Sequence, residues 1–291
     1  MFSSVMTNAW IGGTIVAIVA GVVGFFVVLR GAAFAAHTLP SGAFAGAAAA
    51  RLFGLDQLIG VLLFTGVGVL SINQLSRRAH HDVATALSLV MLLAAGALFL
   101  SLASGFTEVI YALLFGNVLG IRTSQIWLIA LIGLFSVAAL LAFFRPLLLN
   151  SLSPELCEAQ GIRNRMIDLA FLAVLGLATA MALPVVGALL IFSLMVGPPC
   201  AARFLTSRPG ISMALSVGLS VLTIWVSIAL AYAVNWPVGF FVGVLTAVLY
   251  GFGRLWAWAQ GRALLSNLVL RPPSASSRSE AISESDIASA L

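Results

Sequence analysis

The sequence contains no lysine, few charged residues and only two cysteines. All fourteen basic residues are Arg, which excludes a P-loop nucleotide site and Schiff-base chemistry because both require a Lys. Charged residues make up 8% of the 291 residues and hydrophobic residues 62%, against about 25% and roughly 45–50% in a soluble domain. This composition excludes an ordinary water-soluble fold and disorder over most of the length. Cys157 and Cys200 are too few for a disulfide framework or a four-cysteine zinc site.

Long apolar runs predict an all-α, polytopic bundle of about eight or nine membrane-spanning helices. A spanning helix needs about 20 mostly apolar residues, and these runs are apolar on every face, unlike the alternating strands of a barrel. A further apolar piece, 109–121, is too short to cross, so we expect it to be re-entrant or interfacial. The nine candidate spans are 8–29, 38–52, 55–75, 84–104, 124–144, 166–182, 184–205, 211–233 and 237–259.

The positions of the Arg residues predict the orientation. With the N-terminus outside, ten Arg of the membrane region fall inside and only Arg51 and Arg122 fall outside. Cytoplasmic loops of proteins in the lipid bilayer are enriched in basic residues. This bias explains the net charge of +5, so we expect no nucleic-acid partner. We expect a multi-pass protein of the inner or plasma membrane with a cytoplasmic C-terminus. Residues 1–262 form the predicted transmembrane domain, and the Ser-rich stretch 263–291 a disordered tail.

The predicted spans contain almost no ionisable residues. Asp56, Glu108 and Asp168 lie at span ends, whereas a carrier driven by protons or sodium commonly keeps a carboxylate within the membrane. A zinc protease motif H-E-x-x-H is also missing. We therefore expect no enzyme, and a protein whose energy comes from another subunit. A secondary carrier and an intramembrane enzyme are the less favoured alternatives.

The longest inside loop carries a local helix signal. Ser153 suits an N-cap, Pro154 the first helical position, and Glu155 the positive end of the helix dipole. Gly161 then supplies a stop. The pattern predicts a short helix within about 153–161, either as a simple connector or as a docking element for a cytoplasmic partner.

At this loop the sequence resembles the zinc, manganese and iron class of ABC importer permeases. The segment from Glu155 to Gly161 is similar to that family's coupling helix, and 114–119, 186–202 and 235–239 are similar to its other motifs, in the same order. The resemblance implies a homodimeric permease that binds no cofactor and moves a divalent metal ion. A separate ATPase subunit hydrolyses ATP, and an extracytoplasmic solute-binding protein delivers the metal. The residues implied to contact the ATPase are Glu155, Glu158, Ala159 and Gly161.

The same resemblance implies a translocation path through His37, Ser41, Pro198 and Asn235, with His37 as the metal ligand. This sequence departs from the family there, since His37 and Asn235 replace Asp residues and Ser41 replaces a His. Zinc and manganese prefer anionic or imidazole donors, so a same-architecture permease with a non-metal substrate is an alternative, and His37 is alternatively a helix-end His bonded to backbone. Pro198 is expected to kink its helix. The small residues of 42–50 favour close helix packing, either in a dimer or within one subunit.

Overall fold

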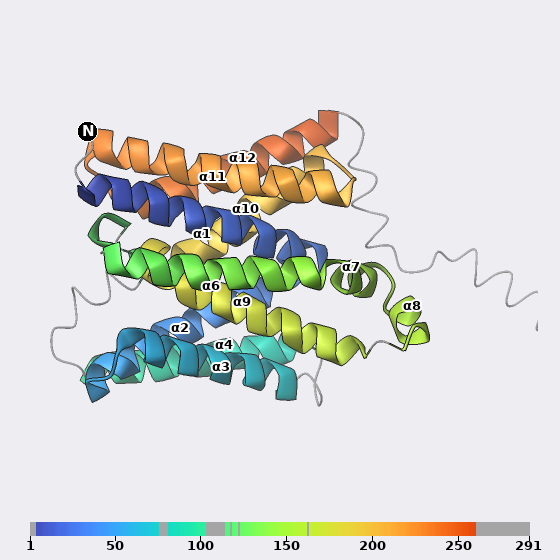
Figure 1. The fold of residues 1–291 in the computed structure, drawn as a ribbon, viewed down its shortest axis with the longest axis horizontal. Helices are drawn as coiled ribbons and strands as arrows, with labels where there is room; N and C mark the ends of the chain where they lie inside the picture. The colour runs from blue at the N-terminus through green and yellow to red at the C-terminus, as the bar shows by residue number, and fades with distance from the viewer. Residues whose placement is uncertain are drawn as a thin grey trace, which may run out of the picture.

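The structure is a computed structural model that describes residues 4–75, 81–102, 114–116, 118–121, 123–161 and 163–259. The described elements are helical and form one elongated bundle (Figure 1). The helices are α1 Ser4–Leu29, α2 Ala33–Phe53, α3 Gln57–Leu75, α4 His81–Leu102, the 3₁₀ turn η1 Val118–Gly120, α6 Thr123–Ala142, α7 Phe144–Leu152, α8 Pro154–Ala159, α9 Asn164–Val186, α10 Ala188–Leu205, α11 Pro209–Val234 and α12 Val238–Ala259.

Seven of the described helices are long and apolar enough to cross a membrane, namely α1, α3, α4, α6, α9, α11 and α12. The predicted all-α membrane bundle is confirmed, but the count of nine spans needs two qualifications. The α10 helix contributes only a shorter apolar stretch, Leu190–Leu205. The α2 helix has 21 residues, more than the predicted 38–52, but it is rich in Ala and Gly and is absent from the seven.

The break between α9 and α10 was predicted at the wrong residue. Pro184 lies inside α9, which continues to Val186, because a Pro in the last turn still permits helical backbone on its C-terminal side. The chain turns at Gly187, which has φ +85° and whose added Cβ would lie 2.3 Å from the Gly116 backbone nitrogen. This backbone contact, which only Gly allows, sets the end of α9. In the predicted re-entrant piece 109–121, the structure describes residues 114–116 and 118–121, which include the short turn η1.

The α2 helix lies inside the bundle, against α3, α4, α9 and α10. Almost all of its residues from Ala35 to Ala50 are buried. A Cβ on Gly46 would lie 2.2 Å from the Gly60 carbonyl oxygen of α3, and one on Gly60 would lie 2.3 Å from the Gly46 oxygen. The small residues of 42–50 therefore pack within one subunit. Because α2 faces protein more than lipid, it needs less hydropathy than a lipid-facing span.

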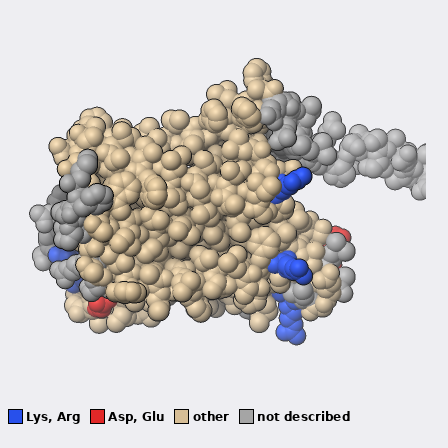
Figure 2. All heavy atoms as spheres, turned by 45° about the horizontal axis from the view of Figure 1, so that its top comes forward, with Lys and Arg blue, Asp and Glu red and all other residues tan. Residues whose placement is uncertain are grey.

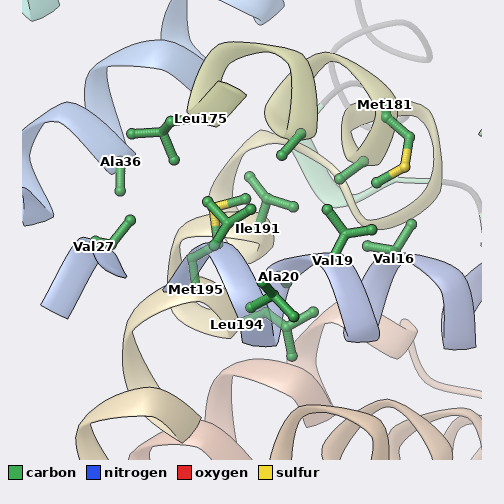
Figure 3. Packing of buried hydrophobic residues seen from close by; sticks show 14 of the residues in the cluster. Val16, Val19, Ala20, Val27, Ala36, Leu175, Met181, Ile191, Leu194 and Met195 are labelled. Carbon is green, nitrogen blue, oxygen red and sulfur yellow. The ribbon is translucent and has the colours of Figure 1, made fainter. Parts of the chain in front are cut away.

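The central core forms where α1 packs against α9 and α10. Figure 3 shows Val16 and Val19 of α1 near Met181 of α9, with Ile191 and Met195 of α10 alongside, and all five are buried. The approach of α1 to α10 is close, since a Cβ on Gly24 would lie 2.3 Å from the Met195 carbonyl oxygen. This packing holds the end of α1 in a fixed position beside α9.

On the face that Figure 2 shows, the charged side chains lie toward the two ends of the bundle and the wide middle is uncharged. One end carries the start of α9 together with α8, and Arg51 lies at the other end, where α2 stops. The Arg residues at the α8 end are Arg30, Arg145, Arg163, Arg165, Arg203, Arg208 and Arg254. The separation expected from the sequence is therefore present in the described residues. The predicted tail 263–291 lies outside them.

Candidate coupling and translocation site

The predicted short helix is present as α8, and it stands beyond the end of the bundle (Figure 1). The Cys157 N–H donates to the Ser153 carbonyl at 3.3 Å and opens the helix. Gly161 has φ +74°, the left-handed conformation expected of a helix stop, and donates its N–H to the Glu158 carbonyl at 2.9 Å. The local signals of Ser153 and Gly161 thus predicted this element correctly.

The α8 helix has one anchored face and one exposed face. Cys157 is fully buried and belongs to the central core. Glu155 and Glu158 are exposed, three residues apart on one face. Glu158 also accepts a hydrogen bond from Asn164 Nδ2 at 2.9 Å, which connects α8 to the first turn of α9. The two carboxylates are therefore presented outward from a helix that is fixed to the bundle. Ala159 is the last residue of α8.

A polar cluster that the sequence did not reveal connects α7 and α9, the two helices that flank α8, to the end of α1. Asp168 on α9 accepts hydrogen bonds at one oxygen from Arg30, which follows α1, and from Asn150 Nδ2 of α7, the latter at 3.0 Å. The Arg30 guanidinium also lies over the Phe171 ring, 5.0 Å from its centroid. Asn150 and Arg30 are only 7% and 12% exposed. Asp168 was predicted only as a span-end carboxylate, since its partners are far away in sequence.

His37 and Ser41 lie one turn apart on α2. The His37 ring meets Phe192 of α10 edge to face, with centroids 5.0 Å apart. Its Nδ1 is buried and has no hydrogen-bond partner in the described part of the chain. Ser41 is buried and donates its hydroxyl to the His37 carbonyl at 3.1 Å. The imidazole therefore has a free nitrogen inside the bundle, whereas the Ser41 hydroxyl proton is already used within α2.

The other two predicted path residues, Pro198 and Asn235, lie on or at the end of other helices than His37 and Ser41. Pro198 is buried inside α10, the helix that also contributes Phe192. Asn235 is exposed at the end of α11 and has φ +57°, a left-handed conformation that Asn adopts more readily than most residues. Because α11 runs antiparallel to α1, with Ile224 and Ile228 near Gly13, Asn235 lies at the end of the bundle opposite α8. Its backbone conformation is a sufficient reason for Asn there.

The described residues contain no group of three or more His, Cys, Asp or Glu side chains placed to hold a metal ion. A single imidazole provides one donor, fewer than the four of a structural zinc site or the three protein ligands of a catalytic one.

A bundle of long apolar helices with basic residues gathered at one end is typical of a multi-pass membrane protein. The sequence profile of the ABC 3 transport family matches residues 3–256. The chain therefore belongs to the ABC 3 transport family, whose membrane subunits are not catalytic.

Individual relatives agree with this assignment. The chain is 26% identical over 261 residues to a protein of Listeria monocytogenes named "Manganese transport system membrane protein MntC", covering 89% of this chain and 92% of that one. It is 25% identical over 231 residues to the "High-affinity zinc uptake system membrane protein ZnuB" of Buchnera aphidicola, covering 78% and 88%. The solved structure titled "PsaBC from Streptococcus pneumoniae in complex with Fab" matches with a TM-score of 0.77 at 24% identity, covering 85% of this chain and 90% of that one. This last likeness confirms the fold.

Proposed function

We propose that this chain is the membrane-spanning subunit of an ABC importer that carries a divalent metal ion, manganese or zinc. Family membership over residues 3–256 supports the importer class, and the manganese and zinc relatives support the cargo. Two copies of the chain form the path, a pair of ATPase subunits supplies the energy, and an extracytoplasmic binding protein delivers the ion. The N-terminus faces outside and the α8 end faces the cytoplasm, in keeping with the Arg bias.

The observation that carries the proposal is the form and position of α8. It is a short helix beyond the bundle, with a buried side chain at Cys157 and exposed carboxylates at Glu155 and Glu158. A fixed helix with an exposed charged face suits a groove on a partner that pushes against it. Glu155 and Glu158 contact the ATPase in this proposal, and Gly161 gives α8 its sharp end. Ala159, the last residue of α8, is the fourth residue of the proposed contact.

The ion passes close to α2, where His37 has an unpaired nitrogen. The imidazole is an acceptable donor for either metal. Ser41 on α2 and Pro198 on α10 are the further path residues of this proposal, and the two helices pack against each other. Asn235 contributes at the outer end, where the binding protein releases the ion. Iron belongs to the same set of candidate cargoes, but the names of the two relatives mention manganese and zinc.

Metal content tests the cargo directly. In a strain that lacks this gene, cellular manganese, zinc and iron are measured by mass spectrometry after growth in metal-limited medium. The proposal predicts a specific fall in manganese or zinc that the intact gene restores and a His37→Ala copy restores only partly. Unchanged contents of all three metals would refute the metal cargo and favour a non-metal substrate.

A further inference from the structure

The turn that joins α1 to α2 is tight and hydrogen-bonded, and it carries a buried positive charge. Ala32 donates its N–H to the Val27 carbonyl at 2.9 Å, and Gly31 adopts φ +65°, which together form a tight helix-ending turn. Arg30 lies in this turn with a side chain that is only 12% exposed. A force applied to the Arg30 guanidinium therefore moves the turn, and with it the start of α2.

The Arg30 guanidinium is paired with the Asp168 carboxylate. Its Nη2 donates to Asp168 Oδ1, while its Nη1 is buried and lacks a hydrogen-bond partner in the part of the chain that the structure describes. The Asp168 side chain is 49% exposed. The guanidinium is thus the shielded member of the pair and the carboxylate is the member in contact with solvent, so the carboxylate is free to change its geometry at lower cost than the guanidinium.

Asn150 adds the third member of this cluster, and it comes from the helix directly before α8. Asn150 Nδ2 donates to the same Asp168 oxygen at 3.0 Å. The α7 helix also touches α1 through Phe144, whose ring lies edge to face with Phe26, with centroids 5.6 Å apart. On the other side of α8, Asn164 of α9 bonds Glu158 at 2.9 Å. Both helices that flank α8 therefore converge on the Asp168 carboxylate.

We propose that Arg30, Asp168 and Asn150 form a clasp that transmits the movement of α8 to the α1–α2 turn. The three are positioning residues, since they act through α2 and are not among the residues proposed for the ion path. A displacement of α8 shifts α7 and α9, which together hold Asp168 and Asn150, and the clasp passes this shift to Arg30. The α2 helix, with His37 seven residues after Arg30, then moves relative to α10. This inference rests on the proposed contact between α8 and the ATPase.

The test uses the complete complex of this chain with its ATPase and binding protein, reconstituted in lipid vesicles. Two rates are measured for each variant, ATP hydrolysis and ⁵⁴Mn²⁺ or ⁶⁵Zn²⁺ uptake, and their ratio gives ions moved per ATP. A merely structural role lowers both rates together, in proportion to the amount of folded complex, and leaves the ratio unchanged.

Asp168→Asn keeps the shape of the side chain and removes its charge. We expect uptake to fall about tenfold while hydrolysis changes little, a size typical of coupling between two sites. Asn150→Ala removes one donor and leaves the ion pair, so we expect a smaller fall in the ratio. The exchanged pair Arg30→Asp with Asp168→Arg restores part of the ratio that either single change loses. Ser151→Ala is the matched control on α7, because within the described residues the Ser151 hydroxyl donates to the Leu147 carbonyl of its own helix and to no member of the clasp.

An unchanged ratio in both Asp168→Asn and Asn150→Ala would overturn the clasp. If Asp168→Asn does not assemble, Asn150→Ala decides alone, with a lowered ratio supporting the clasp and a normal ratio refuting it. If the wild-type chain binds no ATPase, the proposed function itself is refuted. If the complex forms and every variant keeps the wild-type ratio of ions per ATP, only the clasp is refuted.

Discussion

The close packing of α2 against α3 gives a sharp prediction for Gly46→Ala. The new Cβ would lie 2.2 Å from the Gly60 carbonyl oxygen, 2.7 Å from the Gly60 carbonyl carbon and 2.8 Å from Phe64 Cβ. Two of these atoms are backbone, so no side-chain rotation relieves the collision and the helices must separate. Overpacking of this kind costs about 3 kcal/mol, and the better helix propensity of Ala recovers about 1 kcal/mol. The expected net loss is about 2 kcal/mol, or about 4–8 °C in Tm.

Gly66→Ala on α3 is the matched control, because a Cβ there meets nothing within 4 Å. This variant gains only the propensity term and is expected to be more stable by about 0.5–1 kcal/mol. The assay is thermal unfolding of the purified protein in detergent, with oligomeric state measured by light scattering. If both variants shift Tm in the same direction, the packing argument is wrong. If Gly46→Ala dissociates a dimer and leaves the Tm of the monomer unchanged, residues 42–50 form a subunit interface instead.

Three further predictions follow from polar groups in the bundle and at its ends. Asp168→Ala leaves the shielded Arg30 without its partner and is expected to cost about 3 kcal/mol, whereas Arg30→Met leaves a half-exposed carboxylate and costs about 1 kcal/mol; equal Tm losses would contradict this asymmetry. Ser216→Ala removes a buried hydrogen bond, 2.7 Å long, from the Ser216 hydroxyl to the Gly21 carbonyl, and it is expected to cost about 0.5–1 kcal/mol of stability. Ser220→Ala is expected to cost nothing, because in the described part of the chain the buried Ser220 hydroxyl has no partner. Equal losses of Tm in the two variants would contradict a stabilising role for the Ser216 hydrogen bond. Glu155→Arg combined with Glu158→Arg should abolish co-purification of the ATPase while the Tm of the variant chain stays unchanged. Gln57→Arg, at the other end of the bundle, should leave the complex with the ATPase intact.

Local chemistry and apolarity were sufficient to predict much of this molecule from its sequence. The seven strongly apolar helices, the short helix after Ser153 and the stop at Gly161 all depend on residues close together in the chain. The Arg bias was equally visible, since it needs only the order of spans and loops. The resemblance to the metal permeases was carried by short motifs and is confirmed by the family match over residues 3–256.

Features that depend on distant contacts were not predictable in the same way. The end of α9 at Gly187 follows from its contact with Gly116, about seventy positions away, so Pro184 was the more visible but wrong signal. The α2 helix was predicted too short because its lack of hydropathy reflects burial among other helices. The Arg30–Asp168 pair joins residues 138 positions apart, and nothing local to Asp168 indicates its partners. The roles of His37, Ser41, Pro198 and Asn235 in transport stay predictions.

The most direct test of the account is ATP-driven metal uptake into vesicles that contain this chain with or without its ATPase. The account predicts uptake of manganese or zinc only when the ATPase, ATP and the binding protein are all present, and loss of that uptake in the Glu155→Arg, Glu158→Arg variant. Uptake by the chain alone, driven by a proton or sodium gradient, would contradict it.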